Sequence, residues 1–121
     1  PEGVETLGLD AFGECLKLQS VILPSTLRTI SRGVFWKCKS LKKITIPASV
    51  ETIGEYAFFH CDSLKHVYNY STEPQPLSVI FNRKDITIHV PAASVEKYRK
   101  AQHWRDMNIV AMRDEEIMDE R

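Results

Sequence analysis

The sequence has no long apolar run and no excess of charge of either sign. Its 121 residues include 16 basic and 16 acidic side chains, so the formal net charge is zero. No stretch approaches the ~20 apolar residues that span a membrane, and the first residues do not resemble a signal peptide. The charge balance indicates no particular class of partner, and a hydrophobic content of 43% is ordinary for one globular domain.

Motifs of common catalytic and cofactor sites are also missing. There is no glycine-rich phosphate loop, no H-E-x-x-H zinc motif and no G-x-S-x-G nucleophile motif. The three cysteines are an odd number, so they cannot form a closed set of internal disulfides, and no C-x-x-C pair indicates zinc. We therefore predict a protein that is not an enzyme, with no metal and no cofactor.

What the sequence does contain is a 23-residue repeat, written three times. The cysteines stand at 15, 38 and 61, and the same shift relates several sets of apolar residues. These sets are Phe12, Phe35 and Phe58; Leu18, Leu41 and Leu64; Val21, Ile44 and Val67; and Leu7, Ile30 and Ile53. A fixed period of about 20 to 29 residues is typical of leucine-rich solenoids, in which each unit buries its apolar face against its neighbours.

Each unit predicts one short strand and a return path. Apolar and polar residues alternate over 19–23, 42–46 and 65–69, as in strands with one buried face. Pro24 and Pro47 should end the first two strands, because proline has no N–H to donate to a ladder. A short helical turn that carries the inward phenylalanine should follow, and the parallel strands should stack like residues on like.

Two segments, LQSVILPSTLRTISRGVFWKC and LKKITIPASVETIGEYAFFHC, resemble the BspA-type leucine-rich repeat of bacterial surface proteins. The C-terminal third is similar to the terminal segment of that family. The sequence departs from the commoner leucine-rich pattern, which has asparagine or cysteine after the strand, where this chain has proline. The resemblance implies an α/β solenoid with one short parallel strand per repeat, short helical turns and a C-terminal capping helix.

The resemblance also implies a function. It suggests a secreted or cell-surface bacterial protein that attaches to host matrix proteins or to other cells by binding protein partners. The alternative is a structural spacer or stalk with no ligand of its own. A fold of this kind hosts many functions, so the family pattern is more specific for architecture than for activity.

We expect one leucine-rich repeat domain over residues 1–112. Its repeats should occupy about 1–23, 24–46 and 47–69, followed by a capping unit over 70–112 and an acidic, disordered tail over 113–121. Because Pro1 already fills the slot after a strand, we expect the chain to be the C-terminal piece of a longer solenoid. Its first unit should then fray or self-associate edge to edge.

The capping unit should close the open end of the core with a helix. Ser94 is placed to cap that helix by accepting an N–H from its first turn. Val95, Tyr98, Ala101 and Trp104 form an apolar stripe that would cover the core.

The cysteines allow two interpretations. Cys38 lies beside Trp36 and among lysines, and nearby cations favour the reactive thiolate. However, a nucleophile is needed once, whereas these thiols fill one repeated slot, and a buried free cysteine behaves as a small hydrophobe. We therefore interpret them as part of a structural ladder, formed by Cys15, Cys38, Cys61, Phe12, Phe35 and Phe58.

Outward positions of the predicted strands are the better candidates for function, because solenoids often bind partners through the sheet face. By the alternation, these candidate partner-binding residues are Ser20, Ile22, Lys43, Thr45, His66, Tyr68, Thr87 and His89. A solvated face without a partner is the alternative. Residues 15–50 contain seven basic side chains and no acidic one, but the repeat scatters them, so we predict a solvated segment and no nucleic-acid site.

Overall fold

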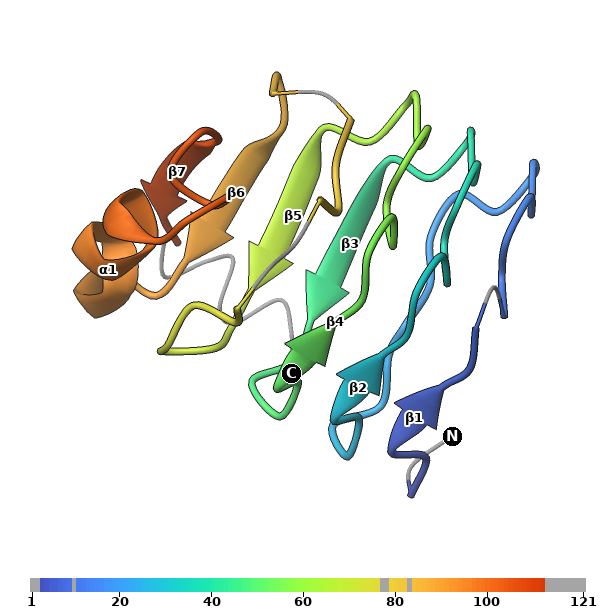
Figure 1. Ribbon diagram of the computed structural model, residues 1–121, viewed down its shortest axis with the longest axis horizontal. Coiled ribbons are helices and arrows are strands. Elements are labelled where there is room, and N and C mark those ends of the chain that lie inside the picture. The colour runs from blue at the N-terminus through green and yellow to red at the C-terminus, as the bar shows by residue number, and fades with distance from the viewer. Residues whose placement is uncertain (1–2, 10, 77–78, 83, 113–121) are drawn as a thin grey trace.

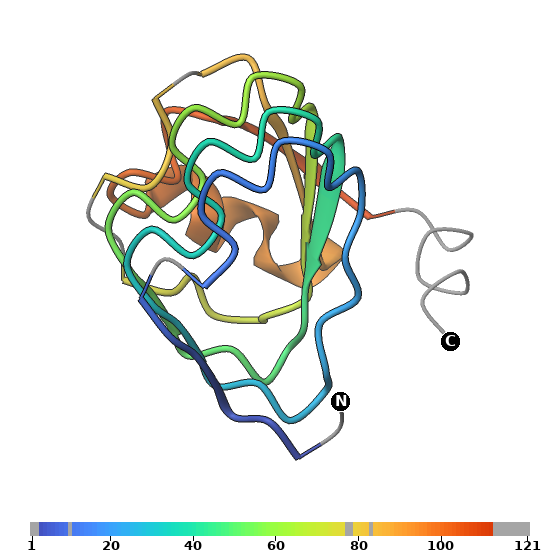
Figure 2. The ribbon, with the colours of Figure 1, turned by 90° about the vertical axis from the view of Figure 1, so that its right-hand side faces the viewer.

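The computed structural model describes residues 3–9, 11–76, 79–82 and 84–112. Over these residues the chain winds into coils that stack along the long axis of the molecule, with helix α1 (Val95–Lys100) at one end (Figure 1). Seen along that axis, successive coils overlie one another around a shared interior (Figure 2). The predicted solenoid of parallel strands with a C-terminal helix is therefore confirmed. The predicted disordered tail lies outside the described residues.

The longer of two parallel sheets contains the strands predicted over 42–46 and 65–69. It runs in the order β3 (Lys43–Ile46), β5 (His66–Asn69), β6 (Thr87–Val90) and β7 (Asn108–Ala111). Strand pairing places Ile44 opposite Val67, Val67 opposite Ile88, and Ile88 opposite Ile109. All four side chains are buried, because this face of the sheet packs on the core.

A second parallel sheet, which the sequence did not predict, forms on the return path. It consists of β1 (Thr6–Leu7), β2 (Thr29–Ile30) and β4 (Thr52–Ile53), in that order. Its register pairs Leu7 with Ile30 and Ile30 with Ile53. Strands of two residues are too short to show an alternation in the sequence.

The strand predicted over 19–23 is wrong: these residues, all of them described, form no strand. In the next coil the Tyr70 N–H donates to the Ile46 carbonyl at 3.0 Å and closes the ladder between β3 and β5. Pro47 occupies the corresponding position one coil earlier and has no N–H to donate. The pairing between 19–23 and β3 is correspondingly sparse, with the Lys42 N–H 3.3 Å from the Gln19 carbonyl oxygen.

The core is organised as a ladder of aromatic rings. Phe12 stacks on Phe35 with ring centroids 5.6 Å apart, and Phe35 stacks on Phe58 at 5.5 Å. The stack continues to Phe81 at 5.6 Å, and Trp104 meets Phe81 edge-on. Each of these residues follows the previous one by 23 positions, so the aromatic slot is occupied from the first coil to the cap.

The first coil is less covered than the others. Leu27 is the first fully buried apolar residue among those described, whereas Val4, Leu7 and Phe12 are only partly buried. No described strand pairs with β1 on the side away from β2. The self-association of this unit remains a prediction.

The cap closes the other end with the predicted residues, but not as predicted in every detail. Tyr98 and Trp104 are fully buried, and a 3₁₀ turn, η1 (Ala92–Ser94), precedes α1. The prediction that Ser94 caps the helix is wrong, because its side chain makes no cap hydrogen bond and donates instead to the Thr72 carbonyl at 2.7 Å. Ser94 thereby fastens the helix to the preceding loop.

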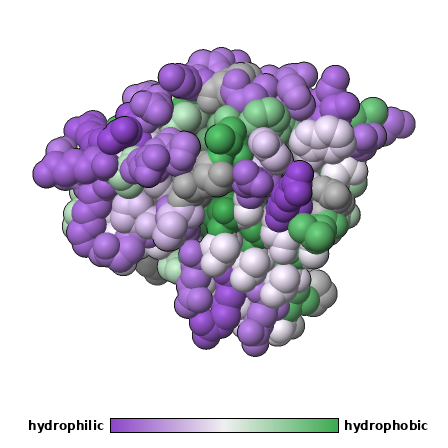
Figure 3. Space-filling view, in the orientation of Figure 1, coloured by the Kyte–Doolittle hydropathy of each residue, from purple (hydrophilic) through white to green (hydrophobic). Residues whose placement is uncertain are grey.

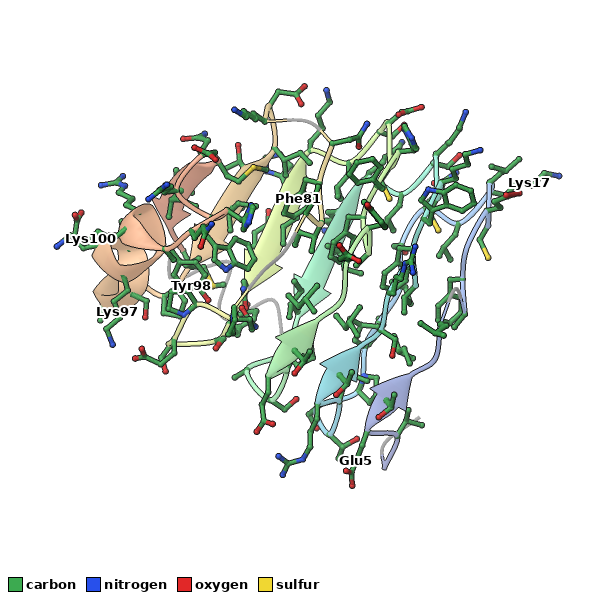
Figure 4. All side chains as sticks on the ribbon, in the orientation of Figure 1. Glu5, Lys17, Phe81, Lys97, Tyr98 and Lys100 are labelled. Carbon is green, nitrogen blue, oxygen red and sulfur yellow. The ribbon has the colours of Figure 1, made fainter. Side chains whose placement is uncertain are left out.

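The same loop holds the two large aromatic side chains of the cap. The Tyr98 hydroxyl donates to the Ser71 carbonyl at 2.8 Å, and the Trp104 indole N–H donates to the Gln75 carbonyl at 2.9 Å. Lys97 pairs with Glu73 of the same loop, whereas Lys100 points away from the body of the solenoid (Figure 4). Burial raises the pKa of Tyr98 well above the usual range of a tyrosine.

Candidate functional site

The outward side of the longer sheet holds most of the predicted partner-binding residues. Strand pairing sets Lys43, His66 and Thr87 in one row, and Thr45, Tyr68 and His89 in the next. Ser20 and Ile22 precede these rows by one repeat, in the segment that forms no strand. Ile22 is 97% exposed, the largest value among the exposed large hydrophobic residues of the described chain. The face therefore combines a basic group, an aromatic ring and an exposed aliphatic side chain.

Three rings on this face form one cluster. Tyr68 stacks on His89 with centroids 4.2 Å apart and planes 18° from parallel. His66 Nδ1 lies 3.0 Å from His89 Nε2, so one ring donates and the other accepts. The expectation that His89 is an accessible binding residue is wrong, because its neighbours leave it only 7% exposed. His89 instead supports the accessible rings of His66 and Tyr68.

A basic hollow adjoins the cluster at the start of the strands. It measures about 650 Å³, and its lining includes Ser20, Lys43, Lys65 and His66. Lys65 also lies 3.9 Å from Asp85, a pair on the surface that contributes little to stability. An acidic side chain of a partner would find several donors here.

The cysteines lie in the core beside the aromatic ladder. Cys38 and Cys61 are buried and Cys15 is partly buried, and all three are free thiols. Cys38 Sγ donates to the Phe12 carbonyl at 3.0 Å, and Cys61 Sγ donates to the Phe35 carbonyl at 3.1 Å. Burial raises the pKa of Cys38 to about 11. The lysine next to it, Lys37, is directed over the Trp36 ring, 4.5 Å from its centroid.

We expect the native thiols to react slowly with alkylating reagents. At pH 8 a thiol with a pKa of about 11 is ionised in about one molecule in a thousand, and the thiolate is the reactive form. Mass spectrometry of iodoacetamide-treated protein should show Cys15 modified first, because it is the most accessible. Unfolded protein is the control and should label at all three positions. Rapid labelling of Cys38 in the folded protein would support the alternative of an activated nucleophile.

The sequence interpretation missed a second hollow, on the segments that follow β1, β2 and β4. It measures about 890 Å³, and Trp36, Tyr56 and Phe59 are among its lining residues. The sequence did contain a signal for this hollow, because it has aromatic residues at repeat positions other than that of the inward phenylalanine. In the view of Figure 1 the α1 end is mostly hydrophilic, while apolar side chains show among the coils (Figure 3).

In the part of the chain that the structure describes, no group of three or more histidine, cysteine or acidic residues could hold a metal ion. None of the helices in that part has both the length and the apolar character needed to cross a bilayer.

Comparison with known proteins identifies the repeat. Among solved structures, the chain is similar to the pneumococcal vaccine antigen PcpA, with 21% sequence identity and a TM-score of 0.63. That likeness shows the fold, and it covers 93% of this chain but 34% of the PcpA chain. No curated protein matches. A family model described as the BspA type leucine rich repeat region (6 copies) matches residues 1–99. The chain therefore belongs to the BspA-type leucine-rich repeat family.

Proposed function

We propose that this chain is a non-enzymatic binding module of a secreted or surface-anchored bacterial protein, and that it engages a protein partner through the outward face of the longer sheet. The observation that carries the proposal is Ile22, an aliphatic side chain that is 97% exposed in the repeat position before Thr45. Its row also contains the half-buried ring of Tyr68. The family and the PcpA likeness support a location at the cell surface.

The composition of this face fits a protein–protein contact. Tyrosine is enriched in the buried centres of interfaces, where it combines a large apolar area with a hydroxyl group. Tyr68 is held in place by its stacking on His89, so little side-chain freedom is lost when a partner binds. Lys43 and the adjoining basic hollow would select partners that carry acidic side chains near an apolar patch.

A binding assay with host matrix proteins tests the proposal. Ile22→Ser and Lys43→Ala change exposed side chains, and Tyr68→Ala removes the central ring. Surface plasmon resonance against immobilised matrix proteins should show binding that Tyr68→Ala weakens by about 30-fold, the effect of one central interface residue. Circular dichroism should show that the variants remain folded.

Lys100→Ala provides the matched control, because this exposed lysine lies on α1 at the far end of the solenoid (Figure 4). Its affinity for the same matrix protein should equal that of the unaltered chain. If the three sheet-face variants bind as well as the control, the partner uses another surface. If the unaltered chain binds neither matrix proteins nor host cells, the spacer alternative is favoured.

A further inference from the structure

The groove that follows β1, β2 and β4 has the size and lining of a ligand site. Its volume of about 890 Å³ lies within the range of about 300 to 1,000 Å³ common for small-molecule pockets. Its lining contains three aromatic side chains, Trp36, Tyr56 and Phe59, together with Glu14, Arg32 and His60. None of these residues belongs to the face proposed above.

The repeat explains why a groove forms here. Trp36 and Phe59 occupy one slot of successive coils, and the preceding coil has Gly13 in that slot. Tyr56 occupies another slot, which Gly33 fills one coil earlier. Glycine in one coil and a large ring in the next leave a hollow with aromatic walls. The hollow is therefore a consequence of side-chain size differences within two slots.

Tyr56 stands in a slot that glycine fills in the preceding coil. Its backbone φ is 60°, in the left-handed region that disfavours bulky residues, whereas Gly33 adopts a φ of 68° in the same slot. Glycine meets that conformation without strain, and the chain nevertheless places a tyrosine there. A positive φ also recurs at Glu14, Lys37 and His60, which share one slot of three coils, so this backbone conformation belongs to the turn geometry of the repeat.

Cationic side chains lie over two of the ring faces in the groove. The Arg32 guanidinium lies over the Tyr56 ring, 5.5 Å from its centroid, and the Lys37 ammonium lies over Trp36. Phe59 meets Tyr56 edge-on at 4.9 Å, which fixes the orientation of both rings. Long, flexible cationic side chains cover these faces, and a ligand can displace them.

The polar groups of the groove include both a donor and an acceptor. The His60 backbone N–H donates to Asn82 Oδ1 at 2.8 Å, which turns the Asn82 amide nitrogen toward His60 Nδ1 at 3.3 Å. His60 Nδ1 then accepts, so the neutral ring carries its proton on Nε2 and donates from there. Glu14 supplies an accepting carboxylate, and its charge balances that of Arg32 across the lining.

We propose that this groove binds an uncharged linear oligosaccharide. Sugar rings present apolar C–H faces that stack on aromatic rings, and their hydroxyl groups need both donors and acceptors. The balanced charge of the lining favours a neutral ligand. The step between coils also fits: successive rings of the inward phenylalanine ladder lie 5.5 to 5.6 Å apart, close to the length of one pyranose unit, and side chains of a groove slot are offset by the same coils.

A proline-rich peptide, the other ligand that aromatic grooves commonly take, matches this spacing less well. Its helix rises about 3.1 Å per residue and repeats after three residues, or about 9 Å. Neither length corresponds to one or two steps of the aromatic slots.

The oligosaccharide site is independent of the sheet-face function, so either proposal can fail without the other.

Titration with cellohexaose and fully N-acetylated chitohexaose tests the proposal, with binding followed by calorimetry and tryptophan fluorescence. Trp104 is fully buried, so a change in fluorescence on binding reports Trp36. Tyr56→Gly is the decisive variant, because glycine fills the same slot one coil earlier and the fold should be retained. We expect it to weaken binding by about 5- to 10-fold, the effect of one aromatic contact.

Lys43→Ala, on the other face, should leave the sugar affinity unchanged. The proposal is overturned if neither neutral oligosaccharide binds at millimolar concentration, or if Tyr56→Gly binds as tightly as the unaltered chain. Stronger binding of a proline-rich peptide would assign the groove to peptides instead. A preference for heparin oligosaccharides that disappears with added salt would show attraction to charge alone.

Discussion

Phe58→Ala should lower the free energy of unfolding by about 3 to 5 kcal/mol, the usual cost of removing a buried phenylalanine ring. Its side chain is 1% exposed and stacks on Phe35 at 5.5 Å and on Phe81 at 5.6 Å. The substitution leaves a cavity between two rings that the flanking coils hold apart. Guanidinium denaturation followed by circular dichroism measures the change.

Phe12→Ala is the matched control for this prediction. Phe12 occupies the same slot, but it is only partly buried and stacks on Phe35 alone among the described aromatic residues. Water can reach much of the space that the ring leaves, so we expect a loss of about 1 to 2 kcal/mol. Equal losses for the two variants would contradict the idea that the ladder is stabilised from both sides.

The 23-residue period was sufficient to predict the fold and the inward residues that β3 and β5 contribute to the longer sheet. Successive coils are related by one shift, so any residue pointing inward in one coil identifies its counterparts in the others. Ile44 and Val67 were predicted inward on this basis and are buried. Residues that recur with the period share one environment in the fold. Whether that environment is buried restricts the residue type more than any other feature does.

Backbone pairing was harder to predict, because it depends on hydrogen bonds between coils that carry little sequence signal. Residues 19–23 alternate as a strand should, but Pro47 removes the donor that closes the corresponding ladder in the next coil. The sheet of β1, β2 and β4 consists of two-residue strands without a detectable pattern. β7 lies beyond the cap helix, where the repeat no longer sets the register.

For the candidate sites, the sequence predicted which side of the sheet each residue takes but not its accessibility. His89 points outward as predicted, yet Tyr68 and His66 cover it. Large side chains in neighbouring rows cover one another in this way. The alternation of apolar and polar residues along one strand contains no information about such contacts. The aromatic groove was missed for a related reason, since it depends on differences between coils rather than on what they share.

Gly54→Ala should destabilise the protein by about 3 kcal/mol, as overpacking does where neighbouring atoms cannot move. An added Cβ at this position would lie 2.4 Å from the Arg32 backbone nitrogen and 2.7 Å from the Ser31 carbonyl carbon. These contacts are with backbone, so no side-chain rotation relieves them. The Gly54 N–H donates to the Ile30 carbonyl at 2.7 Å, which holds the two coils together at this point. Thermal and guanidinium unfolding would measure the loss.

Gly8→Ala tests whether close packing, rather than the loss of a glycine, is responsible. Gly8 is in the same repeat slot, but an added Cβ there meets nothing within 4 Å. Because alanine restricts the unfolded chain more than glycine does, we expect Gly8→Ala to be neutral or to stabilise the fold by up to about 1 kcal/mol. The two variants should therefore change stability in opposite directions. A similar loss in both would contradict the explanation by close packing, because Ser31 fills the same slot in the middle coil without the backbone freedom of glycine.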